Sequence, residues 1–91
     1  MIISKNVTIG ATPTLIHKAT SNGCHIYLAH ANGGDAITLG TATVTYNSGY
    51  TLSGTGQGNH YISGMLPPGD SLYGVCDTGY SETIGVMIVE F

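Results

Sequence analysis

The chain of 91 residues fits one domain, and only 8% of its residues are charged: two lysines, no arginine and five acidic residues. With no basic cluster, a net charge of −3 and no apolar stretch near the ~20 residues of a membrane-spanning helix, the chain is not expected to bind nucleic acid or membranes. The polar surface must then consist mainly of Thr, Ser, Asn and Gly, which suits a protein that is packed against neighbours.

The N-terminal residues 1–10 are predicted to form an extended arm or a first strand, followed by a β-sandwich domain over residues 11–91. The opening MIISKN segment lacks the basic-then-apolar order of a secretion signal, so we expect synthesis in the cytosol. An apolar arm can add a strand to the sheet edge of a neighbouring subunit. The candidate interface residues in this segment are its apolar side chains, Ile2, Ile3, Val7 and Ile9.

Short runs rich in Thr, Val, Ile and Tyr follow, separated by 14 dispersed glycines, and no run shows the 3.6-residue apolar period of a helix. In the run that begins at Cys24, the alternation puts Cys24, Ile26 and Leu28 on one face. Strands are predicted over residues 15–20, 24–31, 36–39, 42–46, 50–53, 60–63, 71–76 and 83–91. The last strand is apolar on both faces, so it is either a central strand or one covered by a neighbour.

Turn signals divide these strands. Pro67-Pro68-Gly69-Asp70 matches a type II turn, in which Gly69 takes the positive φ angle. The segment Gly54 to Gly58 is interpreted as a surface loop and not as a phosphate cradle, because a strand follows it where such a cradle needs a helix. The other predicted turns are Ser21-Asn22-Gly23, Asn32-Gly33-Gly34-Asp35, Asn47-Ser48-Gly49 and Asp77-Thr78-Gly79-Tyr80.

The fold class is therefore predicted to be all-β, a single-domain β-sandwich of about eight or nine short strands. The strand spacing of about 8–12 residues is typical of a sandwich or small barrel, and we expect a jelly-roll-like arrangement. An immunoglobulin-like sandwich is the second choice, because such domains usually centre on a buried Trp and this chain has none.

The histidines, cysteines and serines do not form a recognisable metal-binding or catalytic motif in the sequence. The chain has neither a His-x-His nor a Cys-x-x-Cys pair, so no metal site and no cofactor are predicted from its histidines. No Gly-x-Ser-x-Gly elbow occurs either, and no catalytic residues are assigned; we expect the protein not to be an enzyme. Cys24 and Cys76 are interpreted as buried free thiols, and a single disulfide between them is the alternative. The four histidines are His17, His25, His30 and His60.

Six tyrosines are the remaining candidates for function. Tyrosine is common at protein interfaces because it combines a large apolar area with one polar tip. We therefore add Tyr27, Tyr50 and Tyr73 to the candidate interface residues. A sugar site lined by tyrosine rings and ordinary packing within the sheets are the alternatives.

Several segments together resemble small head proteins of tailed bacteriophages that decorate the capsid. These segments are ATPTLI (residues 11–16), IYLAHANG (26–33), ITLG (37–40), GYTL (49–52), LPPGDSLYGV (66–75) and VMIV (86–89). The resemblance implies a small β-sandwich or jelly-roll protein, made in the host cytoplasm and carried on the outer capsid surface of the virion, often as a homo-trimer. Its implied partner is the major capsid protein, whose neighbouring subunits it bridges and stabilises. The alternative is a carbohydrate- or receptor-binding module of a phage fibre or tail.

Overall fold

Eight strands and no helix form in residues 1–30, 34–53 and 60–91, the part of the chain that the computed structural model describes. It contains no helix that could cross a membrane. The predicted turn at Asn32-Gly33 and the predicted loop from Gly54 to Gly58 lie outside these described residues. The strands are β1 Ile2–Ile9, β2 Thr14–Lys18, β3 Cys24–Ala29, β4 Ile37–Gly40, β5 Tyr50–Leu52, β6 Tyr61–Leu66, β7 Ser71–Cys76 and β8 Glu82–Glu90.

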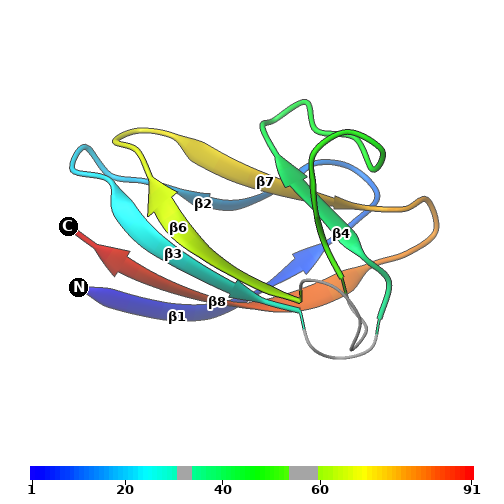
Figure 1. Cartoon of the computed structure of the whole chain (residues 1–91), viewed down its shortest axis with the longest axis horizontal. Coiled ribbons are helices and arrows are strands. Elements are labelled where there is room, and N and C mark those ends of the chain that lie inside the picture. Colours follow the sequence, from blue (N-terminus) through cyan, green and yellow to red (C-terminus); the bar gives the residue numbers. More distant parts are fainter. Residues whose placement is uncertain (31–33, 54–59) are drawn as a thin grey trace.

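The strands form two antiparallel sheets of four strands each, in the orders β1-β8-β3-β6 and β2-β7-β4-β5 (Figure 1). The first half of the chain pairs with the second half in reverse order: β4 with β5, β3 with β6, β2 with β7 and β1 with β8. A long hairpin that is rolled over into two sheets in this way is a jelly roll. The predicted all-β sandwich of jelly-roll type is confirmed.

The core lies between the two sheets. The predicted alternation in β3 is confirmed, because Cys24, Ile26 and Leu28 are buried while Tyr27 and Ala29 are exposed. Strand β8 lies between β1 and β3, which confirms the central-strand alternative for the end of the chain. Its inward residues Ile84, Val86 and Ile88 meet those of the second sheet, Ile16, Ile37, Leu39 and Leu52, in one apolar cluster.

The predicted strand over residues 42–46 is wrong. Residues 41–49 fold into two tight turns, with hydrogen bonds from Val44 N to Thr41 O (3.0 Å) and from Ser48 N to Thr45 O (3.0 Å). The alternation of Val44 and Tyr46 suggested a strand, but the segment instead lies on the outer face of the second sheet. Thr38 on that face is 1% exposed and donates a hydrogen bond to Tyr46 O (2.8 Å).

The predicted turns at Ser21–Gly23 and Pro67–Asp70 are confirmed. Gly69 has a φ of 77°, and Asp70 N donates to Pro67 O at 3.0 Å, as a type II turn requires. Gly23 also has a φ of 77°. Only β7 has the predicted bounds, and most other strand ends differ by one or two residues; the largest difference is that β6 continues to Leu66. In β6 the alternation of exposed and half-buried residues continues through Gly64, although glycine weakens a strand interior.

The positive φ angle of Gly69 can be tested by comparing an alanine substitution there with one at a glycine whose φ is not positive. We expect Gly69→Ala to lower the free energy of unfolding by about 1 kcal/mol, because an L side chain is strained at positive φ. Gly64→Ala is the matched control, since a Cβ at either position meets nothing within 4 Å and Gly64 has no positive φ. Urea unfolding of both variants measures the difference. Equal stabilities would contradict the assigned turn.

Candidate interaction surface

The outer face of the sheet β1-β8-β3-β6 carries no charged side chain. Successive residues of a strand point to opposite faces, so this face is formed by every second residue of each strand. We call it the outer sheet face. Its residues are Ile2, Ser4, Asn6 and Thr8 of β1, Thr83, Gly85, Met87 and Val89 of β8, His25, Tyr27 and Ala29 of β3, and Tyr61, Ser63 and Met65 of β6.

Large apolar side chains on the outer sheet face are exposed. The exposed fraction is 73% for Tyr61 and 66% for both Ile2 and Met65, while Tyr27 and Met87 near the middle are 38% and 39% exposed. Single exposed apolar residues are ordinary, but several on one face of a small domain make that face a candidate interaction surface.

The outer face of the second sheet is different, because the chain itself covers it. Thr38 and Val75 face each other across β4 and β7 on that side, and both are buried. Val44 is also buried, and its side chain lies 2.9 Å from the position that a Cβ on Gly40 would take. The turns of residues 41–49 therefore cover part of the second sheet, whereas no described segment covers the outer sheet face.

A groove of about 740 Å³ crosses the outer sheet face. In the strand register, Asn6, Gly85, Ala29 and Tyr61 form one row across the four strands. The two central members of this row have almost no side chain, so the face is hollow between the larger residues. The other groove-lining residues on this face are Ser4, Tyr27, Ser63 and Met87.

The structure separates the predicted interface residues of the N-terminal segment. The segment is β1, an edge strand paired with β8 along its whole length. Only Ile2 lies on the outer sheet face; Ile9 is in the core, and Ile3 and Val7 pack against it. An interface role for Ile3, Val7 and Ile9 does not fit this arrangement, because these three side chains attach β1 to its own sandwich.

The three predicted tyrosines lie on different surfaces. Tyr27 is on the outer sheet face, where it stacks on His25 with ring centres 4.7 Å apart. Tyr73 faces Leu15 on the other side of the sandwich. Tyr50 lines a second hollow of about 360 Å³ between the sheets. The sequence reasoning missed Tyr61 and Met65, although their alternation with Ile62 and Leu66 was a usable signal.

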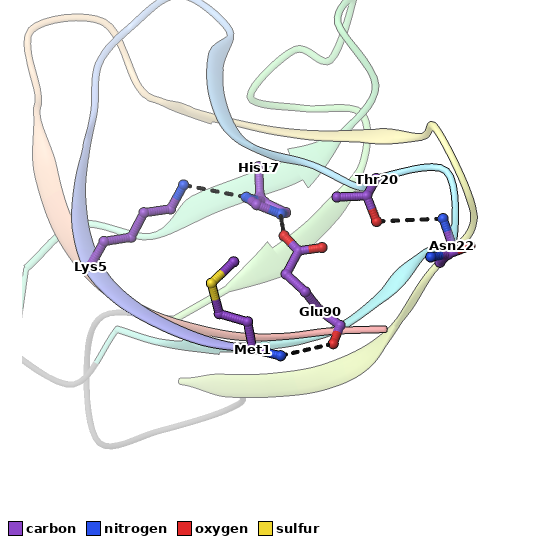
Figure 2. A network of polar contacts seen from close by, with 6 residues as sticks. All are labelled: Met1, Lys5, His17, Thr20, Asn22 and Glu90. Carbon is purple, nitrogen blue, oxygen red and sulfur yellow. Dashed lines mark hydrogen bonds and ion pairs between the residues drawn. The ribbon is translucent and has the colours of Figure 1, made fainter.

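A chain of polar contacts joins the two sheets at the end of the sandwich where both termini lie (Figure 2). His17 Nε2 on β2 is 2.9 Å from Glu90 Oε1 on β8, and His17 Nδ1 is 3.5 Å from Lys5 Nζ on β1. A neutral imidazole with its proton on Nε2 satisfies both contacts, by donating to Glu90 and accepting from Lys5. Because these contacts link β2 of one sheet to β1 and β8 of the other, we call Lys5, His17 and Glu90 the clamp.

The other titratable residues do not form a metal centre. No group of three or more His, Cys, Asp or Glu side chains is placed to hold a metal within the described ranges. His30 is fully buried, and its Nε2 donates to the backbone oxygen of Asp35 and lies 4.0 Å from Glu82 Oε1. This histidine anchors the chain between β3 and β4.

Both cysteines are free and buried, one in each sheet. Burial raises the pKa of the Cys24 thiol, and the negative charge of Glu90 raises it further. Burial also raises the pKa of Cys76, whose Sγ donates to Ile9 O at 3.3 Å. Neither thiol is placed to react or to form a bond between subunits.

The fold and this surface define a jelly-roll protein with one bare sheet face, and comparisons with known proteins add the following. No family model and no curated protein matches the chain. A solved structure of similar fold comes from Bacillus endospore appendages, described as a novel family of disulfide-linked pili. The TM-score is 0.54 at 19% sequence identity, over 100% of this chain and 86% of that chain. At this identity the likeness shows the fold alone.

The burial of the thiols predicts their reactivity. With a thiol reagent such as dithionitrobenzoate at pH 8, the folded protein should react far more slowly than the unfolded protein, because the thiols are shielded and kept protonated. Unfolding in guanidinium should release both thiols. Rapid reaction of either one in the folded state would contradict its buried position.

The clamp predicts energetic coupling between His17 and Glu90. Both side chains are about nine-tenths buried, so His17→Leu or Glu90→Leu alone should lower the free energy of unfolding by about 2 kcal/mol. The double variant should lose less than the sum of the two, because neither His17 nor Glu90 is then left buried opposite a removed partner. The exposed Thr8–Thr83 hydrogen bond, tested with Ala at both positions, is the control for weak coupling. Additive losses at His17 and Glu90 would show that the pair does not act as a clamp.

Proposed function

We propose that this protein is a structural subunit of a larger protein assembly, and that it decorates and stabilises the outer surface of a bacteriophage capsid. In this role it bridges neighbouring subunits of the major capsid protein. The observation that carries the proposal is the outer sheet face, which has no charged side chain, exposes several large apolar side chains and is not covered by any described part of the chain.

The physical argument concerns what an interface must remove from water. Burial of charged side chains costs desolvation free energy that pairing recovers only in part, whereas this face has no charge to desolvate. Burial of a large apolar side chain contributes about 1.5–3 kcal/mol. Ile2, Met65 and Met87 are all exposed on this face, so contact with a partner subunit stabilises the assembly.

Two further points support a structural role. The segments that resemble phage decoration proteins include the LPPGDSLYGV stretch, which forms the type II turn and most of β7. The solved structure of similar fold belongs to pili, which are also protein assemblies. The disulfide linkage named for those pili is not part of this proposal, because Cys24 and Cys76 are buried.

The groove favours a second candidate, a carbohydrate-binding module of a phage fibre or tail. Tyr27 and Tyr61 offer rings for the apolar side of a sugar, and Ser4, Asn6 and Ser63 offer neutral groups for its hydroxyls. The apolar area continues beyond the groove to Ile2 and Met65, where a sugar in the groove would leave it uncovered. We therefore place assembly first.

The proposed function predicts saturable binding to capsids. Purified protein mixed with expanded, genome-free capsids of the phage that encodes it should sediment with them at a fixed ratio of copies to capsid subunits. It should also raise the temperature at which the capsids break open. Protein that stays in the supernatant would contradict a decorating role. Binding to neutral oligosaccharides that Tyr61→Ala removes, without capsid binding, would select the second candidate.

A further inference from the structure

We infer that the outer sheet face binds the same face of a second copy of this chain, which gives a two-fold pair. The inference rests on the proposed function in one respect, namely that this face is an assembly surface. It goes further by naming the partner and the geometry. The resemblance to decoration proteins implies a trimer, so the inference also departs from that expectation.

The first argument is electrostatic. In a two-fold interface each surface meets itself, so a face with net charge would meet the same charge. The chain as a whole has a net charge of −3, yet none of its seven charged residues points outward on this face. A face without charged side chains can meet its own copy without like-charge repulsion.

The second argument is the order of residues across the sheet. A two-fold axis that runs parallel to the strands, between β8 and β3, places β1 of one copy over β6 of the other and β8 over β3. In the row that contains Ile2, Val89, His25 and Met65, this rotation places Ile2 over Met65 of the second copy. Apolar side chains at opposite edges of the sheet thereby cover each other.

The neighbouring rows match in the same way. One row holds Ser4, Met87, Tyr27 and Ser63, so the rotation places Met87 over Tyr27 and one serine over the other. Met sulfur on an aromatic ring is a favourable contact. In the next row the small residues Gly85 and Ala29 meet, and Tyr61 lies over Asn6, whose amide can bond the phenol hydroxyl. In the row of Ser4, Met87, Tyr27 and Ser63, each side chain thus meets its own kind or a suitable partner, while in the row of Ile2 the rotation places Val89 over His25.

The size of the face limits the area that the pair can bury. Four strands spaced about 4.8 Å apart, with about six residues each at 3.3 Å, make a plane of roughly 400 Å² per copy. Because the side chains project from this plane and add to its area, the pair buries on the order of 1,000 Å² in total, at the low end for specific interfaces. We therefore expect a reversible pair that dissociates on dilution, with aligned sheets about 10 Å apart.

The test is the mass of the purified full chain in solution over a dilution series, by light scattering and sedimentation equilibrium. The monomer is 9.4 kDa, and we expect a mass approaching twice this value at high concentration. Met87→Lys places a charge in the middle of the face and should weaken pairing at least tenfold. Met65→Lys, at a more exposed position of an edge strand, should do the same if Met87→Lys fails to fold. Circular dichroism checks the fold of each variant.

Leu15→Lys is the matched control. Leu15 is 47% exposed on the opposite side of the sandwich, so this variant adds the same charge to another exposed apolar strand position. It should pair as the unaltered chain does.

The inference is overturned by a monomer at all concentrations, by a trimer, or by pairing that resists Met87→Lys and Met65→Lys. A monomer whose capsid binding is abolished by Met65→Lys would overturn the pair and keep the decorating role; a pair that ignores capsids would do the reverse.

Discussion

The structure depends on one constraint, the pairing of each strand in the first half of the chain with its counterpart in the second half. The nearest pair, β4 with β5, joins residues about a dozen positions apart, and the most distant pair, β1 with β8, joins the two ends of the chain. Once these four ladders form, the contacts of β8 with β3 and of β7 with β4 complete the two sheets. The position of both termini at one end follows from the same pairing (Figure 1).

This pairing also creates the outer sheet face. Its four strands come from residues 2–9, 24–29, 61–66 and 82–90, so the rows across it combine residues from the whole length of the chain. No short motif can reveal such a surface. The alternation within each strand was readable from the sequence, as in Cys24, Ile26 and Leu28, but the neighbour of each strand was not. For this reason the sequence could indicate Tyr27 while it missed Tyr61 and Met65.

The errors of sequence reasoning have a common physical cause. Alternation shows which residues share a face only if the segment is a strand. It does not show which of the two faces points to the core. Residues 42–46 alternate but turn back on the sheet, and Ile3, Val7 and Ile9 alternate correctly but face inward. Turns were more predictable, because Gly69 and Gly23 take positive φ angles that depend on local chemistry alone. The clamp of Lys5, His17 and Glu90 joins three strands of two sheets and had no local signal.

The clamp also reduces the number of charged residues on the protein surface. The chain has seven charged residues, and the clamp takes Lys5 and Glu90 partly out of the solvent. Asp35 and Glu82 are also partly buried, so Lys18, Asp70 and Asp77 are the charged residues left exposed. These three lie in β2 or in turns that flank β7, away from the outer sheet face. A domain with so few exposed charges has little electrostatic repulsion between copies, which is the property that the proposed assembly requires.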